Sequence, residues 1–284
     1  SGRFEEPFRF NGSDTRSNSG IFMLMLTHTY ILQQIMGASG FKGVDPDIYI
    51  YNIAPDLLTI HPDIHASQTH SIKRFFKAPP DHARTAYVMF HLLVDDLAHY
   101  GKISLECQEG FDPNSSGYTY VKGRLLVNAI MDLHKLIDKA ISYDEAAYRS
   151  HLIIEMIYDL VILSRIHQDK SIELLEEAIS FTQEKRENEF CENMSWLYSI
   201  EKEAARDVLK SAASYITKER MDRIMNIEGR IRLFTDKFGL RNKNEMFQEA
   251  IATLFQNALN SIENEEFLQE IFDTVRNSGW QPTD

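Results

Sequence analysis

Histidines and carboxylates recur one helical turn apart in two apolar segments of this sequence. His91, Asp95 and His99 stand at positions i, i+4 and i+8 of YVMFHLLVDDLAHYG, so they share one face of a helix. His151 and Glu155 have the same i, i+4 spacing in SHLIIEMIYDLVIL. Burying an unpaired carboxylate is costly, and coordination of a metal ion is one of the few ways to offset that cost. The spacing predicts metal binding, with a hydrogen-bonded His–Asp–His row in a helical core as the alternative.

Further residues of metal-ligand type precede these two segments. Asp56 follows a proline among apolar residues, which suits either a fixed carboxylate ligand or a helix N-cap. His61, His65 and His70 come next, and the first two stand near polar residues that favour a surface position. His28 lies in the apolar segment MLTHTYIL, where a single histidine is more often a core residue than a ligand. Each of these residues supports metal binding only when it is considered together with the others.

The pair His134 and Asp138 and the single residue Asp96 serve as contrasts. His134 and Asp138 also have i, i+4 spacing, but the leucines and isoleucines of DLHKLIDKAI form an apolar stripe on another face. That pattern predicts that both side chains are solvated. Asp96 lies about 100° round the helix from Asp95, and we expect it to tolerate asparagine better than Asp95 does.

Several common catalytic signatures are absent from the sequence. It contains no adjacent His–Asp dipeptide and no HExxH, P-loop, GxGxxG or GxSxG motif. The pattern Asp96-x-x-His99 is reminiscent of a di-iron bundle, but such a bundle needs two carboxylate-x-x-His repeats from two helices, and the second is not found.

Taken in order, the candidate residues resemble the ligand series of the zinc-dependent phospholipase C family and its relatives, the three-zinc single-strand nucleases. That series is His, Asp, His, HxxxD, His and HxxxE/D. The 14-residue spacing from Asp56 to His70 fits the family and favours His70 over His65. LTHTYIL is similar to the Thr-His opening of bacterial members, and IAPDLL is similar to their Pro-Asp segment. The resemblance covers roughly His28 to Glu155.

The resemblance implies an all-helical fold and a cluster of two or three zinc ions. In the family arrangement one ion is bound by Asp56, His70, His91 and Asp95. Asp95 then bridges to a second ion that His28 also binds, and His99, His151 and Glu155 hold the third. Asp56, Asp95 and Glu155 are the carboxylates expected to take part in catalysis.

The implied chemistry is hydrolysis of a phosphodiester. A metal-bound water loses a proton near neutral pH and attacks phosphorus in line, while the other cations stabilise the remaining oxygens. Two alternatives stay open. One is an inactive or repurposed all-helical family member that keeps a structural metal, and the other is a di-iron helical bundle protein.

The elements that must position these residues are predicted to be helices. Glycine and proline are scarce (13 and 8 of 284 residues), which favours long helices. Hydrophobic periodicity predicts helices over 21–36, 81–100 and 121–141, and a further helix after the capping box at Ser142 and Glu145. The segment from Ser171 onward reads as amphipathic helices, with start signals at Ser171, Thr217 and Asn242.

Two segments depart from this pattern, and together with the helices they define the expected domain. Residues 41–80 hold five of the eight prolines and are predicted to form a long irregular loop with helical turns. Residues 1–20 read as a flexible leader or the remnant of an expression tag. Residues 21–284 are then one all-α domain of the phospholipase C type, with a metal-site half (21–168) and a helical C-terminal half (169–284).

Charge and composition restrict the partners. The formal net charge of −12 disfavours non-specific binding to a polyanion, so a phospholipid is favoured over single-stranded nucleic acid as substrate. The sequence contains no run of 18 apolar residues, so it predicts no membrane-spanning helix. The two cysteines give no disulfide framework, so both a cytoplasmic and a mature secreted or periplasmic location remain open, as does the oligomeric state.

Overall fold

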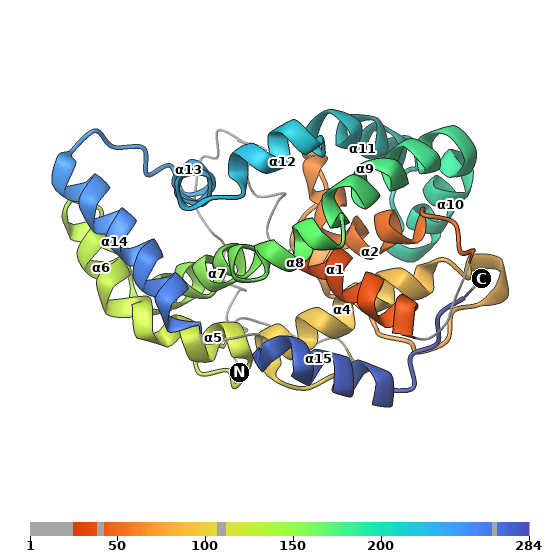
Figure 1. The fold of residues 1–284 in the computed structure, drawn as a ribbon, viewed down its shortest axis with the longest axis horizontal. Helices are drawn as coiled ribbons and strands as arrows, with labels where there is room; N and C mark the ends of the chain where they lie inside the picture. The colour runs from red at the N-terminus through yellow and green to blue at the C-terminus, as the bar shows by residue number, and fades with distance from the viewer. Residues whose placement is uncertain (1–24, 39–42, 107–111, 263–265, 284) are drawn as a thin grey trace, which may run out of the picture.

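Four helices with buried faces meet in the middle of the molecule (Figure 1). They are α1 (Met25–Ala38), α2 (Ile48–Leu57), α4 (Thr85–Tyr100) and α7 (Tyr143–Val161). In α4 every residue from Thr85 to Ala98 is buried, because nearly all of them are apolar and the helix is covered on all sides. Helix α4 therefore lies deep in the core, as the apolar segment 81–100 predicts, although it begins at Thr85 after a short 3₁₀ turn.

This computed structural model describes residues 25–38, 43–106, 112–262 and 266–283. Within these described ranges, eleven further helices lie around the central ones. They are α3 (Ala66–His70), α5 (Tyr118–Gly123), α6 (Val127–Lys135), α8 (Leu163–Gln168), α9 (Ser171–Phe181), α10 (Glu187–Tyr198), α11 (Lys202–Tyr215), α12 (Lys218–Ile224), α13 (Ile227–Lys237), α14 (Glu245–Ser261) and α15 (Glu266–Asn277). In Figure 1, α6 and α14 lie side by side at one end, α10 and α11 pair at the other, and α15 packs along α1 and α4.

The described residues confirm the all-α prediction. They contain helices and connecting turns but no strand, and their helices form one compact domain. The predicted leader, residues 1–20, lies outside the described residues, as do residues 21–24 of the first predicted helix. Among the described residues, no helix is long and apolar enough to cross a membrane.

The prediction of an irregular loop over 41–80 is wrong for its middle part. Residues Ile48–Leu57 form the regular helix α2, continued by a 3₁₀ turn over Leu58–Ile60, and the short helix α3 follows. Pro55 lies inside α2 and removes one intrahelical hydrogen bond, yet the helix continues to Leu57. The proline count misled the prediction because a single proline did not end the helix.

Helix boundaries differ from the predictions in a second place. The segment 121–141, predicted as one helix, is divided into α5 and α6 by a 3₁₀ turn, and α6 ends at Lys135. The N-cap predictions fare better: Ser142 accepts a hydrogen bond from the Glu145 amide, and Thr217 accepts one from the Arg220 amide. The cap of α14 is Asn244, two residues after the predicted signal at Asn242.

Candidate metal centre

The Asp95 carboxylate on α4 is surrounded by three imidazole rings. Its Oδ1 lies 3.1 Å from Nε2 of His28 on α1. Its Oδ2 lies 3.3 Å from Nε2 of His70, the last residue of α3, and 3.3 Å from Nε2 of His91, one turn earlier on α4. The two carboxylate oxygens thus face different histidines, which is the arrangement that lets one carboxylate bridge two cations.

Asp56, near the end of α2, completes a four-residue group on one side of Asp95. Its Oδ1 lies 3.3 Å from Nε2 of His70, and its Oδ2 lies 3.9 Å from Nε2 of His91. Two donors on one tetrahedral zinc ion at about 2.05 Å are separated by about 3.3 Å. Three of the contacts among Asp56, His70, His91 and Asp95 therefore match the separation of two donors on one zinc ion, and the fourth, at 3.9 Å, is longer.

The ring nitrogens of His91 favour the presence of a cation between His91 and the two carboxylates. The His91 and His28 rings are fully buried and stacked, with centroids 3.9 Å apart. Neither ring nitrogen of His91 has a hydrogen-bond partner among the described residues, although Nε2 contacts two carboxylates. A buried nitrogen without a partner is costly, and a cation between Nε2 and the carboxylate oxygens would remove that cost.

A third donor group is formed by the next turn of α4 and by α7. His99, one turn after Asp95 on α4, places Nε2 2.5 Å from Oε1 of Glu155 on α7. His151, one turn earlier on α7, has its Nε2 3.8 Å from the same oxygen. All eight predicted ligands are thus brought together in three groups whose donor atoms lie within 4.8 Å of one another: His28–His91–Asp95, Asp56–His70–His91 and His99–His151–Glu155.

The choice of His70 over His65 agrees with the structure. His65 is exposed and serves as the N-cap residue of α3, where it forms a capping box with Gln68. The ring of His70 faces the carboxylates through Nε2, while its Nδ1 lies 3.1 Å from the Ala66 carbonyl. A carbonyl on one ring nitrogen fixes the proton there and leaves the other nitrogen free to bind a metal.

The carboxylates keep protons on two of the imidazoles. Burial opposes a charge on His70, yet Asp56 and Asp95 outweigh it and raise the pKa of His70 to about 10. Burial is likewise outweighed at His99, where Glu155 raises the pKa to about 9. Metal binding needs neutral imidazoles, so uptake of a cation here releases protons.

His91, His151 and Asp95 are already in the protonation states that a cation requires. Burial, then the neighbouring His28, lowers the pKa of His91, and burial, then His99, holds the pKa of His151 well below its usual value. Burial alone would raise the pKa of Asp95, but the attraction of His91 and the hydrogen bonds from its histidine neighbours hold it well below the usual range. At neutral pH these are a charged carboxylate and two neutral rings.

Three of the predicted ligands are partly exposed to solvent. The side chains of Asp56, His70 and His99 keep about a quarter of their surface exposed, at 24%, 25% and 24%. The other ligands are buried. Structural zinc sites are closed by protein ligands, whereas catalytic sites keep an open position.

The contacts of Asp96 argue against the expectation that it tolerates asparagine. It is fully buried and forms a two-point ion pair with Arg74, at 2.8 and 3.3 Å. Arg74 in turn donates a 2.7 Å hydrogen bond to the His70 carbonyl. Asparagine at position 96 would remove the counter-charge of a buried guanidinium that holds a candidate ligand. Because its carboxylate faces Arg74, Asp96 belongs to none of the donor groups found in the described residues. The pattern Asp96-x-x-His99 therefore does not form the carboxylate–histidine pair that a di-iron bundle would need.

Asp159 is a second residue whose importance the sequence reasoning missed. It continues the α7 stripe one turn beyond Glu155, and that spacing is the signal that was available. Its Oδ1 accepts hydrogen bonds from the amide and the hydroxyl of Thr27, at 3.0 and 2.6 Å, and its Oδ2 lies 2.9 Å from the Arg230 guanidinium. Asp159 therefore holds Thr27, the residue before His28, against α7.

The prediction that His134 is solvated is wrong, whereas Asp138 is exposed. His134 is buried between α6 and α7, where a guanidinium nitrogen of Arg149 lies 2.7 Å from Nε2 and the Lys139 carbonyl lies 3.1 Å from Nδ1. Since the guanidinium is always a donor, Nε2 must accept and the ring must be neutral. The spacing argument failed because the turn after α6 folds back over this face.

This arrangement predicts a loss of stability in acid. Burial, then the charge of Arg149, lowers the pKa of His134 to about 4. Between pH 6.5 and 4 the unfolded chain therefore binds a proton at this histidine, and the folded chain does not. His134 should by itself contribute a fall of roughly 3 kcal/mol in the free energy of unfolding across that window, and no further fall below it. In His134→Gln, whose amide oxygen can still accept from Arg149, urea titrations should show a smaller fall. Equal pH dependence in the two proteins would contradict this account.

Comparison with known proteins gives no further guide. No protein-family model matches the chain, and no curated protein and no solved structure matches it either. The function therefore has to be argued from the donor groups themselves.

Proposed function

We propose that this protein is a metal-dependent hydrolase of phosphodiesters, similar in mechanism to the zinc-dependent phospholipases C. The observation that carries the proposal is the arrangement of donors: five imidazoles and three carboxylates, contributed by five helices, form three contiguous groups with donor spacings of 3.1–3.9 Å around Asp95 and Asp56. Mixed nitrogen and oxygen donors without thiolate suit zinc, for which we propose two or three ions.

Each group would have its own part in this chemistry. Asp56, His70, His91 and Asp95 would hold one cation, Asp95 and His28 a second, and the His99–His151–Glu155 group a third. Bound divalent cations supply Lewis acidity and positive charge at the phosphate and activate water as a nucleophile. Asp56, Asp95 and Glu155 orient that charge. The exposed edges of Asp56, His70 and His99 form the side from which a phosphate would approach.

The substrate class is argued from charge. A net charge of −12 repels a nucleic acid strand as a whole, whereas a single phosphate can be attracted by a local cluster of cations. We therefore propose a phospholipid, or another small phosphodiester, in preference to single-stranded nucleic acid.

A structural metal in a protein without activity is the main competing function. The quarter-exposed ligands favour catalysis over a closed structural site, because an open coordination position serves no structural purpose. Metal content and turnover together separate the two. Protein purified without chelator should contain about two or three equivalents of zinc. Metallated protein that hydrolyses neither phospholipids, nucleic acids nor nitrophenyl diesters would establish the structural role instead.

Removing either ligand on α7 should abolish hydrolysis. With His151→Ala or Glu155→Gln the third group keeps only two protein donors, too few to hold a cation firmly. We expect each variant to lose activity on a nitrophenyl phosphodiester by about 100-fold or more, with folding retained by circular dichroism. Asp138→Ala is the matched control, since Asp138 is exposed and stands outside the donor groups. Full activity in His151→Ala would contradict the proposal.

A further inference from the structure

The C-terminal end of α4, which carries His99, is held by three hydroxyl groups from one short segment. Thr119 donates to the Ala98 carbonyl at 2.9 Å, Ser115 donates to the His99 carbonyl, and Ser116 donates to the Tyr100 carbonyl at 3.1 Å. The last carbonyls of a helix have no partner within the helix. Segment 115–119 supplies partners for three of them in succession and so fixes the backbone on both sides of His99.

Two glycines let α5 approach the backbone of both α4 and α7. A Cβ at Gly117 would lie 2.0 Å from the His99 carbonyl carbon and 2.2 Å from its oxygen, closer than real contacts allow. A Cβ at Gly123 would lie 3.0 Å from the His151 amide nitrogen. The two glycines bracket α5, and the backbone atoms that they approach belong to the two histidines of the third donor group.

Between these two contacts, Tyr120 lies against both histidine rings. Its ring stacks on His151 with centroids 4.4 Å apart and planes 14° apart, and it meets His99 edge to face at 6.3 Å. Tyr120 is buried. A large rigid ring in van der Waals contact with two imidazoles restricts the orientation of each of them.

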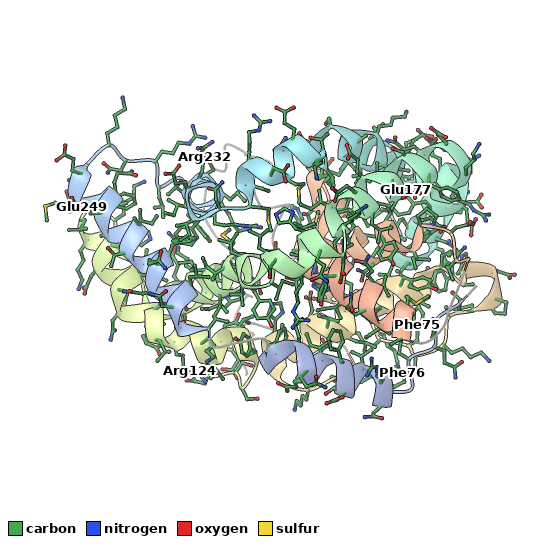
Figure 2. The ribbon with its side chains drawn as sticks, viewed as in Figure 1. Phe75, Phe76, Arg124, Glu177, Arg232 and Glu249 are labelled. Carbon is green, nitrogen blue, oxygen red and sulfur yellow. The ribbon has the colours of Figure 1, made fainter. Side chains whose placement is uncertain are left out.

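Arg124, directly after α5, closes this arrangement. Its guanidinium donates to the Ser115 carbonyl at 2.8 Å and to the Pro113 carbonyl at 3.3 Å. In Figure 2, Arg124 is labelled at the edge of the molecule, beside α5. The turn before α5 is therefore tied to the turn after it.

We propose that seven residues form a positioning clamp that sets the separation and orientation of His99 and His151, and so makes the His99–His151–Glu155 group a cation site that assembles independently of the other two. The clamp residues are Ser115, Ser116, Gly117, Thr119, Tyr120, Gly123 and Arg124. This inference rests on the proposed metal centre. The other ligands have different supports: Asp159 holds the residue before His28, and the Arg74–Asp96 pair holds the His70 carbonyl. Tyr120 is a positioning residue, since it contacts ligands and no reacting atom.

The test compares two tyrosines that stand two residues apart on α5. Tyr120 contacts the two histidines, whereas Tyr118 stacks on Phe267 with centroids 4.7 Å apart. Zinc binding is measured by competition with a chromophoric chelator. In Tyr120→Leu we expect one zinc equivalent to bind about 10- to 100-fold more weakly, with the remaining equivalents unchanged. Tyr118→Leu should bind zinc as the wild type does, and Tyr120→Phe, which keeps the ring, should restore the affinity.

Two further measurements assign the weakened equivalent and guard against misfolding. In a His99→Ala background, Tyr120→Leu should add no further loss, because both changes then act on the same site. Gly123→Ala, a milder change, should weaken the same equivalent if Tyr120→Leu does not fold. Unchanged affinity in Tyr120→Leu, or equal loss at every equivalent, would overturn the clamp while leaving the metal centre intact. A wild-type protein that binds no zinc would overturn both.

Discussion

Asp95→Asn should leave the protein with about one zinc equivalent in place of two or three, and with phosphodiesterase activity lowered by about 100-fold or more. Among the described donor residues, Asp95 has one carboxylate oxygen that faces His28 and another that faces His70 and His91. Asparagine keeps the shape but has no charge and only one acceptor oxygen. Both groups that share Asp95 should therefore lose their cation, and the His99 group should keep its own.

Metal analysis of the dialysed variant, followed by an assay with a nitrophenyl diester, measures both effects. Asp63→Asn is the matched control because Asp63 is exposed in the turn before α3, outside the donor groups. A normal zinc content in Asp95→Asn would show that Asp95 is no ligand, whatever the activity. Loss of all zinc equivalents would instead show that the third group depends on the first two.

The second large effect concerns stability. Asp159→Ala should lower the free energy of unfolding by about 3–5 kcal/mol, because it leaves the Arg230 guanidinium charged, fully buried and without its counter-charge. It also removes the acceptor of two hydrogen bonds from Thr27. The corresponding fall in melting temperature is roughly 10 °C for a chain of this length.

The surface pair of Asp132 and Lys135 is the comparison. Its side chains are 70% and 64% exposed, so Asp132→Ala should cost less than about 1 kcal/mol. A double variant, Asp159→Leu with Arg230→Met, should regain part of the stability that Asp159→Ala loses, because no unpaired charge is left in the core. If Asp159→Ala unfolds at the same denaturant concentration as the wild type, the buried pair contributes nothing to the native state.

The sequence by itself determined which side chains gather along α4 and α7. The helical period fixes the relative direction of residues four apart, so His91, Asp95 and His99 had to share a face once the segment was helical, as did His151 and Glu155. The apolar residues around them determined that this face points inward. Local spacing therefore predicted the candidate ligands on α4 and α7. The resemblance to the ligand order of the phospholipase C family added His28, Asp56 and His70, which the structure brings into the donor groups.

Tertiary structure alone decided the roles of residues whose partners are distant in sequence. Local helix position led us to expect that Asp96 tolerates substitution and that His134 is solvated. Arg74 and Arg149 instead reach these two residues from other segments and pair with them in the core. The contact of Gly117 with His99 and the pair of Asp159 with Arg230 likewise join separate helices. A helical period specifies the direction of a side chain from its own axis, but only packing against other helices specifies what lies in that direction.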